Sequence, residues 1–338
     1  KAPVIERVET SLEARLVQLI TKDVKTGSDY KEIDLLGRQL ERLARIRRYE
    51  APGGNETDLN PNIANRNAEG KRQKEKNHFT EEQVEQLRAA FLDSLFDYQK
   101  EWWNSRNNRT RAILKSRQIG ATWYFAREAL MDAVLTSGNQ IFLSASRAQA
   151  YVFRQYIVQF AKEAAEVELK GDPIVLSNGA HLYFLGTNAR TAKGYHGNFY
   201  FDEFFWTFKF EELNKVASGM ALHKRWRKTY FSTPSAMSHE AYPFWTGDAF
   251  NKRRRKEEQV RIDVSHKWLA EGRLCEDRTW RQIVTIEDAV ANGWQFTSID
   301  DIRGENTESE FRNLYMCEFV RDGEAAFSLN TLVGCGVD

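Results

Sequence analysis

Residues 114–122 combine basic, small and hydroxyl-bearing side chains in an order suited to binding phosphate. They read Leu-Lys-Ser-Arg-Gln-Ile-Gly-Ala-Thr and follow a short apolar run. A phosphate loop needs inward-facing backbone N–H groups, a glycine near the turn, a lysine for the β- and γ-phosphates and a Ser or Thr for Mg²⁺. Ala121 stands at the usual lysine position, whereas Lys115 replaces the first glycine of the motif. We therefore expect the Lys115 ammonium to reach the phosphates from the opposite end of the loop.

This loop is the predicted site for the phosphates of ATP, with the Thr122 hydroxyl as a ligand of Mg²⁺. Arg117 suits a role on the phosphates of its own subunit or in tuning a catalytic carboxylate. Alone the pattern is weak, because similar loops are common between a strand and a helix. The expected ATP-binding residues of the loop are Lys115, Ser116, Arg117, Gln118, Ile119, Gly120, Ala121 and Thr122.

A second chemical signal is the apolar run at residues 198–201, which ends in the carboxylates Asp202 and Glu203. This pattern fits a Walker B strand, in which Asp202 would hold Mg²⁺ and Glu203 would orient and deprotonate the attacking water. Two acids at a strand end can also form a solvated turn. The phosphate loop upstream favours the catalytic interpretation, so we predict ATP hydrolysis with Glu203 as the base.

Two further polar segments fall where a translocating ATPase would carry them. Ser232 and Thr233 end another apolar run and could sense the γ-phosphate as a coupling motif, although an ordinary Ser/Thr/Pro turn has the same composition. Gln99 precedes the first strand and could read the adenine edge of ATP. An amphipathic helix with Trp102 and Trp103 in the core explains that segment nearly as well.

The elements that must position these residues are short apolar strands that alternate with helical segments. Such alternation predicts an α/β fold with a mainly parallel sheet covered by helices, and ligands at the carboxyl ends of its strands. Together with the phosphate loop, it indicates a P-loop NTPase of the ASCE/RecA-like class, with an added N-terminal helical hairpin. The predicted strands are 111–114, 140–144, 182–185, 198–201 and 228–232.

Four regions are expected along the chain. Residues 1–50 carry apolar side chains at helical spacing on both sides of a Thr-Gly-Ser-Asp turn, which predicts a helical hairpin that packs or docks a partner. Residues 51–78 are rich in Asn, Gly and Pro and then basic, as in a linker. Residues 79–250 form the ATPase core. The less regular residues 251–338 are interpreted as its C-terminal part or a lid subdomain.

Composition excludes several classes of protein. Forty-nine Lys and Arg against forty-eight Asp and Glu leave a formal charge of +1, so any contact with DNA must be local. The three cysteines, Cys275, Cys317 and Cys335, form no C-x-x-C pair, which speaks against a zinc site or a secreted disulfide framework. No apolar run is long enough to cross a bilayer. A cytoplasmic location fits best, and a first residue other than Met suggests a fragment.

The four motifs together resemble one known family, the large terminase subunits of tailed bacteriophages, and within it the P2-like type of temperate contractile-tailed phages. The resemblance covers roughly residues 79–327 and keeps the family's motif order. It is carried by F-x-Y-Q with Gln99, K-S-R-Q-I-G-A-T with Lys115, the segment G-Y-H-G-N-F-Y-F-D-E-F-F-W, and F-S-T-P-S.

The resemblance implies a motor that uses ATP and Mg²⁺ to move double-stranded viral DNA through a portal protein into a procapsid, in the host cytoplasm. It implies a homo-oligomeric ring, a pentamer, and a small terminase subunit as a further partner. It also implies a catalytic arginine from the neighbouring subunit, for which Arg190 is the candidate. The parent protein would also be an endonuclease, whose domain we expect to be absent from this chain.

Two other functions share parts of this pattern. A helicase-like translocase would carry both ATPase motifs but should show a second motor domain, and no second phosphate loop occurs in the 338 residues. A nucleotide-binding assembly module without turnover is suggested by Ala121 at the usual lysine position. ATPase activity that disappears when Lys115 is replaced would exclude the module.

Overall fold

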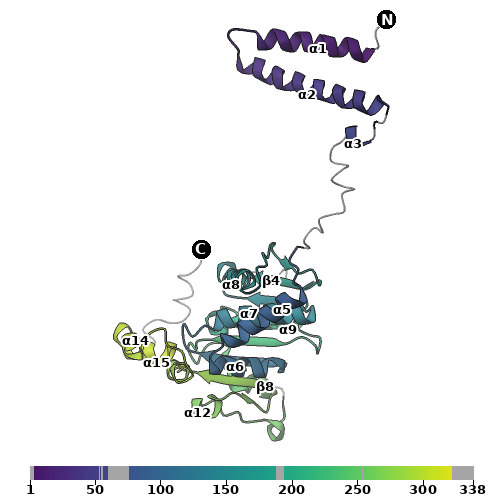
Figure 1. Cartoon of the computed structure of the whole chain (residues 1–338). Helices are drawn as coiled ribbons and strands as arrows, with labels where there is room; N and C mark the ends of the chain where they lie inside the picture. Colours follow the sequence, from purple (N-terminus) through teal and green to yellow (C-terminus); the bar gives the residue numbers. More distant parts are fainter. Residues whose placement is uncertain are drawn as a thin grey trace. The chain divides into compact units, whose positions relative to one another are not determined.

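The computed structural model describes residues 4–52, 54, 56–59, 76–187, 194–252 and 254–321. Its contacts divide the chain into two compact units, residues 1–74 and 75–338. Helices form the first unit, and a sheet with its covering helices forms the second (Figure 1).

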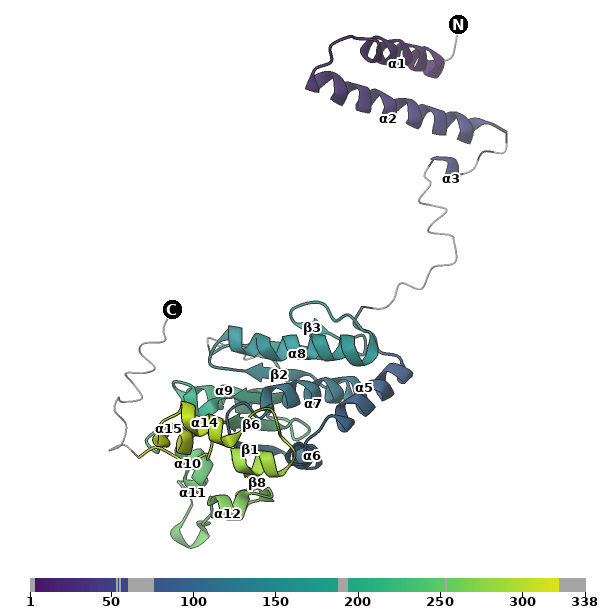
Figure 2. The same cartoon turned by 60° about the vertical axis from the view of Figure 1, so that its left-hand side comes forward.

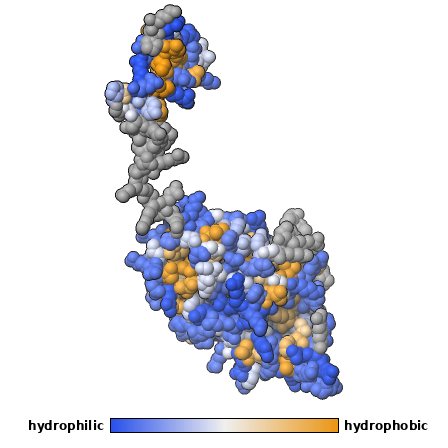
Figure 3. Space-filling model, turned by 90° about the vertical axis from the view of Figure 1, so that its right-hand side faces the viewer, coloured by the Kyte–Doolittle hydropathy of each residue, from blue (hydrophilic) through white to orange (hydrophobic). Residues whose placement is uncertain are grey.

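The first unit is an antiparallel pair of helices with one further turn. They are α1 (Val4–Ile20), α2 (Gly27–Glu50) and α3 (Glu56–Leu59). Thr26 caps α2, which sets the start of the second helix after the turn. Leu19 and Leu36 are buried, and Arg15 Nε donates to Glu32 Oε1 at 2.8 Å across the pair. In Figure 3 the hairpin shows hydrophobic residues bordered by hydrophilic ones. The predicted helical hairpin is therefore present.

The second unit is built on one eight-stranded sheet. The strands are β1 (Thr110–Lys115), β2 (Gln140–Leu143), β3 (Ile174–Val175), β4 (His181–Leu185), β5 (Asn198–Asp202), β6 (Lys228–Ser232), β7 (Arg273–Leu274) and β8 (Thr279–Val284). Their order is β3-β4-β2-β5-β6-β1-β8-β7. The short β3 and β7 are antiparallel to their neighbours, and the other six strands are parallel.

Helices and single turns connect these strands. The α-helices are α5 (Glu81–Asp93), α6 (Asp97–Asn104), α7 (Ala121–Thr136), α8 (Arg147–Ala165), α9 (Phe210–Met220), α10 (Tyr242–Thr246), α11 (Asp248–Asn251), α12 (His266–Leu269), α13 (Ile286–Ala291), α14 (Ile299–Glu305) and α15 (Glu308–Leu314). The 3₁₀ turns are η1 (Ser105–Asn107), η3 (Phe204–Trp206) and η4 (Lys256–Glu258). The α/β fold with a mainly parallel sheet is thus confirmed.

The order of the strands brings the two chemical motifs to one edge. β1 leads into the phosphate loop, β5 ends at Asp202, and β6 runs between them. All three strands are parallel, so their carboxyl ends meet. Lys115, Asp202 and Ser232 are the last residues of β1, β5 and β6.

Each face of the sheet has its own core, because successive side chains of a strand point to opposite faces. Tyr200 of β5 belongs to the cluster under α5, α7 and α8, which pack on one another (Figure 2). Its neighbours Phe199 and Phe201 belong to the second cluster, with residues of α9 and α10. Both faces of β5 are therefore buried, which explains its continuous apolar run.

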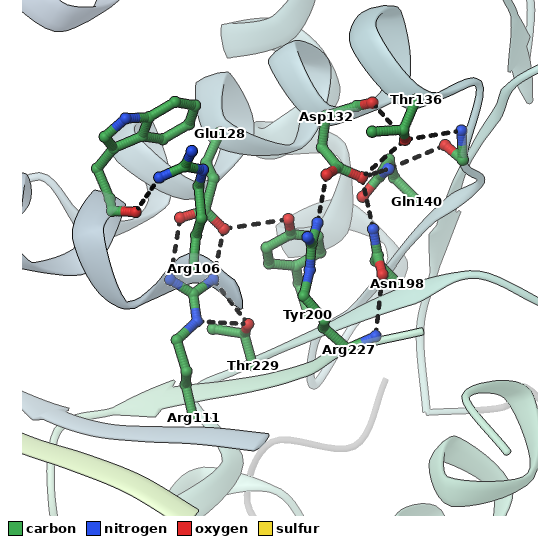
Figure 4. Close-up of polar contacts among 12 residues, drawn as sticks. Arg106, Arg111, Glu128, Asp132, Thr136, Gln140, Asn198, Tyr200, Arg227 and Thr229 are labelled. Carbon is green, nitrogen blue, oxygen red and sulfur yellow. Dashed lines mark hydrogen bonds and ion pairs between the residues drawn. The ribbon is translucent and has the colours of Figure 1, made fainter. Parts of the chain in front are cut away.

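A buried polar network fixes α7 to the sheet at the end of the strands remote from the phosphate loop (Figure 4). Arg111 of β1 forms an ion pair with Glu128 of α7, and both side chains are almost fully buried. Arg111 Nη1 donates to Glu128 Oε2 at 3.0 Å. The hydroxyls of Tyr124 and Tyr200 also donate to Glu128, at 2.8 and 3.2 Å. The helix that begins at the phosphate loop is thus held in place by a charge as well as by apolar contacts.

One turn further along α7, Asp132 makes a second polar centre (Figure 4). It pairs with Arg227 and accepts from Asn198 Nδ2 at 2.6 Å and from Gln140 Nε2 at 2.8 Å. These three partners lie at or next to the starts of β6, β5 and β2. The position of α7 is therefore tied to three strands at once.

The sheet continues beyond residue 250. β8 lies next to β1 in the middle of the sheet and is buried along its whole length. The sheet that carries the phosphate loop therefore includes residues from 251–338, the segment interpreted above as the C-terminal part of the core or a lid subdomain. The same segment also carries the helices α13 and α15, the second of which ends at Leu314.

Candidate active site

The phosphate loop has the backbone of an anion-binding turn. Gly120 caps α7 in the left-handed region, with φ 77° and ψ 22°, and no side chain caps this helix end. No described side chain therefore accepts from its first-turn N–H groups, and the helix dipole favours an anion there. Gln118 has a φ of 57°, a rare conformation for a residue with a side chain. Strain of this kind is concentrated at functional sites.

The first part of the loop is used for packing. The Ser116 N–H donates to the Val284 carbonyl at 2.8 Å, and the Arg117 N–H donates to the Leu314 carbonyl at 2.9 Å. The expectation of inward-facing N–H groups is therefore wrong for these two residues, because they connect β1 to β8 and α15. Ile119 is buried, and Arg117 is exposed.

Lys115 is buried at the end of β1 and points toward the Walker B carboxylates. Its Nζ lies 2.5 Å from Glu203 Oε1. Burial alone would lower the pKa of the Lys115 ammonium, but the negative charges of Glu203 and Asp202 raise it above its ordinary value. Lys115 thus provides a positive charge at the start of the phosphate loop, held in place by its contact with Glu203.

The two carboxylates that follow β5 differ in their electrostatic environment. Burial, together with the charge of Glu203, raises the pKa of Asp202 to about 7. Burial acts in the same direction on Glu203, but the Lys115 charge and several hydrogen bonds hold the pKa of Glu203 below its ordinary value. Glu203 is the carboxylate that stays ionised, which a general base must be. Its φ of 49° turns it out of the strand.

The second oxygen of Glu203 is held by the end of β6. Glu203 Oε2 accepts from the Ser232 hydroxyl at 3.0 Å, from the Thr233 N–H at 3.1 Å and from the Thr233 hydroxyl at 3.3 Å. The sequence predicted that Ser232 and Thr233 belong to the site, but it did not predict their contact with Glu203. Because both oxygens of Glu203 are occupied, its side chain has one well-defined orientation.

Gln99 of α6 lies beside the other end of the loop. Its side chain is buried, and Oε1 accepts from the Phe96 N–H at 3.2 Å. Its Nε2 has no hydrogen-bond partner among the residues that the structure describes. A Cβ atom at Gly120 would lie 3.3 Å from this nitrogen. An unpaired buried donor is costly in a folded protein, so its position next to the phosphate loop fits a ligand that supplies the acceptor.

The remaining predicted residues are placed as follows. Thr122 is half-buried in the first turn of α7, and Ala121 is buried as its first residue. Arg190 lies outside the described residues. Within the described part of the chain, no group of three or more His, Cys, Asp or Glu side chains is placed to hold a metal ion. In the same part, no helix is long and apolar enough to cross a membrane.

Comparison with known proteins assigns this chain to a family. The model described as "Terminase large subunit, T4likevirus-type, N-terminal" matches residues 112–333. The chain belongs to the terminase large subunit family. This confirms the resemblance seen in the four motifs.

Two curated relatives match almost the whole of this terminase chain. It is 57% identical over 337 residues to the "Terminase, ATPase subunit" of Escherichia phage P2, which covers 99% of this chain and 57% of the relative. It is 40% identical over 347 residues to the "Probable terminase, ATPase subunit" of Haemophilus phage HP1 (strain HP1c1), which covers 98% and 56%. The chain thus spans just over half the length of these relatives.

Among solved structures, the HK97 bacteriophage large terminase is similar to this terminase chain at 16% identity with a TM-score of 0.47. That overlap covers 70% of this chain and 55% of the HK97 chain.

One residue of the terminase site was missed in the sequence. Trp206 Nε1 donates to Thr233 Oγ1 at 2.7 Å, so the indole orients the hydroxyl that contacts Glu203. The only signal was the apolar Phe-Phe-Trp directly after the two acids, where a solvated turn would carry polar residues. This contact also links η3, which follows β5, to the end of β6.

Proposed function

We propose that this chain binds ATP at the carboxyl edge of β1, β5 and β6 and hydrolyses it. The observation that carries the proposal is the contact between Lys115 and Glu203. It joins the phosphate loop to an ionised carboxylate whose second oxygen is held by Ser232 and Thr233. A surface turn with two acids would need none of these partners.

Each residue of the site has its own role in this proposal. Lys115 and the N–H groups at the start of α7 bind the phosphates. Asp202 and the Thr122 hydroxyl are oxygen ligands of the kind that Mg²⁺ takes together with phosphates, and the ion would supply charge neutralisation. Glu203 accepts the proton of the attacking water. Gln99 has a donor available for the base of the nucleotide.

We further propose that hydrolysis drives double-stranded DNA into a procapsid. The named relatives, each described as the ATPase subunit of a terminase, support this assignment. The proposal includes a portal protein and a small terminase subunit as partners, a pentameric ring as the active state and the host cytoplasm as its location. It also includes an endonuclease activity for the longer parent protein.

Phosphate release tests the enzymatic part directly. The 338-residue chain would be assayed with ATP and Mg²⁺, with and without linear double-stranded DNA, beside the matched variant Glu203→Gln. We expect turnover in the wild type, a higher rate with DNA, and almost none in the variant although it still binds ATP. Binding without turnover in the wild type, alone and in its assembled parent, would instead support the assembly module. Strand separation of a duplex would support the helicase-like alternative.

A further inference from the structure

An exposed aromatic ring lies beside the start of α6. Phe296 follows α13 and is 78% exposed, although its ring is held in place by two others. Its centroid lies 6.0 Å from that of Phe96 at an interplanar angle of 83°, and 5.7 Å from that of Trp294 at 80°. The Asp97 N–H also donates to the Asn292 carbonyl at 3.3 Å, which connects this loop to α6. The ring of Phe296 is therefore fixed at its edges and open to solvent.

The neighbouring Phe96 has less free surface. Its ring stacks on that of Tyr98, with centroids 5.8 Å apart and planes 14° from parallel. The Tyr98 hydroxyl donates to the Ile119 carbonyl in the phosphate loop at 2.6 Å. A continuous series of contacts therefore runs from the phosphate loop through Tyr98 and Phe96 to Phe296. Phe296 is the member of the series whose ring is still uncovered.

The orientation of the Gln99 carboxamide is set by Phe96. The Phe96 N–H can only donate, so the atom that it contacts must be the oxygen of Gln99, and the NH₂ group points the other way. That NH₂ group is buried, has no acceptor in the described part of the chain, and faces Gly120. The oxygen keeps a second lone pair. Gln99 thus presents one donor and one acceptor next to the phosphate loop.

This pair of groups matches one purine better than the other. A Gln side chain can donate to N7 of adenine and accept from its N6 amino group, whereas guanine offers acceptors at both N7 and O6. A bound base is also stabilised by stacking on an aromatic side chain, and this contact is open to any base because every base has a π-face. Gln99 would therefore select adenine, and an aromatic ring would supply base-independent affinity.

We propose that Phe296 is the residue on which the base of the nucleotide stacks, and that with Gln99 it forms the adenine subsite of the ATP site. The inference rests on the proposed function. Gln99 lies on α6 and borders the phosphate loop, and Phe296 lies in the loop after α13 that contacts the start of α6. The subsite accounts for the uncovered ring of Phe296 and for the unpaired NH₂ group of Gln99.

The test compares a ligand that has a base with one that has none. The affinities of the 338-residue chain for ATP and for inorganic tripolyphosphate would be measured by calorimetric titration. The variants are Phe296→Ala, Phe296→Trp and, as a matched exposed aromatic on α12, Trp268→Ala. We expect Phe296→Ala to weaken ATP binding roughly 5- to 150-fold, as for other base-stacking residues. Its affinity for tripolyphosphate should match that of the wild type.

Phe296→Trp should restore ATP binding because it restores the ring, and Trp268→Ala should leave both ligands unaffected. Wild-type ATP affinity in Phe296→Ala would overturn the inference and point to a partner surface instead. Equal losses for ATP and tripolyphosphate would also overturn it, since they would report a disturbed loop. A wild-type chain that binds neither ligand would refute the proposed function itself, which is a different result.

Discussion

Lys115 Nζ lies 2.5 Å from Glu203 Oε1 across the end of β6, which separates β1, whose last residue is Lys115, from β5, which Glu203 directly follows. The lysine that replaces the first glycine of the phosphate loop thus contacts the carboxylate of the Walker B strand directly. In the proposed site, phosphate oxygens and Glu203 would share this charge, so the affinity for ATP and the ionisation of the base would be linked through one side chain.

Replacing Lys115 by Ala should abolish hydrolysis and weaken ATP binding. The substitution removes the positive charge of the loop and leaves Glu203 without its ion-pair partner. The expected loss is measured as phosphate release at saturating ATP together with titration of ATP. Near-ultraviolet circular dichroism would show that the fold is retained.

Lys115→Met is the matched variant for shape, since it keeps the length of the buried chain without the charge. It should be as inactive as Lys115→Ala. Normal turnover in either variant would mean that another cation serves the phosphates.

Replacing each of the two carboxylates should have a different effect. Glu203→Gln keeps the shape and the contacts with Ser232 and Thr233 but removes the base, so turnover should fall roughly 10²–10⁴-fold while ATP still binds. Asp202→Asn should instead raise the Mg²⁺ concentration needed for binding. The measurements are phosphate release and ATP titration over a range of Mg²⁺. Equal small losses in both variants would show that the roles are assigned wrongly.

The hydroxyl of Thr233 should matter for turnover more than for binding. Thr233→Val removes the group that joins Trp206 to Glu203 but keeps the Thr233 N–H as a donor. A hydrogen bond to a charged group is worth about 1.5–3 kcal/mol, which corresponds to a fall in kcat of roughly 10- to 100-fold. Thr246→Val, which removes another threonine hydroxyl, is the control. A changed ATP affinity with unchanged kcat would contradict the contact's catalytic role.

The predicted strands are confirmed where burial on both faces leaves a readable apolar run, as in β5. β8 was not predicted because it contains Arg281 and Gln282, which a hydrophobic pattern treats as surface residues. Arg281 is buried against Asp277 and the carbonyl of Trp245. Gln282 is buried and accepts from Trp102 Nε1 at 2.8 Å. Asp277 is a local partner, but Trp245 and Trp102 lie far along the chain from the residues that they contact, and no local pattern reveals these two contacts.

In the candidate site, too, local features were predicted from the sequence, whereas contacts between distant residues were not. The order of residues in the chain identified Lys115, Asp202 and Glu203, because a loop and a strand end are local features. The contacts of Glu203 with Thr233, and of Thr233 with Trp206, depend on β6 lying between β1 and β5. That order is a property of the folded sheet.

The buried ion pair of α7 should be important for stability. Glu128→Gln leaves Arg111 charged and buried without its partner, which costs about 3–5 kcal/mol in comparable cases. All nine tryptophans lie from Trp102 onward, so urea unfolding followed by tryptophan fluorescence reports only the second unit. Glu85→Gln breaks an exposed pair with Arg88 and should cost about 0.5 kcal/mol or less. Equal stability of the two variants would contradict the structural role of the network.

Arg190 should act on the active site of a neighbouring subunit if it is the catalytic arginine that family membership leads us to propose. Arg190→Ala should then reduce ATPase in the assembled motor by roughly 10³–10⁵-fold, as for other arginines that stabilise phosphoryl transfer, and far more than loss of a surface charge. The rate of the isolated subunit should be low and should change little. Phosphate release before and after assembly measures both effects.

Mixing two inactive variants then tests the direction of the contact. Arg190→Ala keeps Lys115 and Glu203 intact, whereas Glu203→Gln keeps the arginine. Under ring-forming conditions some interfaces pair an intact base with an intact arginine, so part of the ATPase should return. Normal hydrolysis by assembled Arg190→Ala would place the catalytic arginine elsewhere. A variant that is inactive alone and in every mixture would show that Arg190 works within its own subunit, because no neighbour can then replace it.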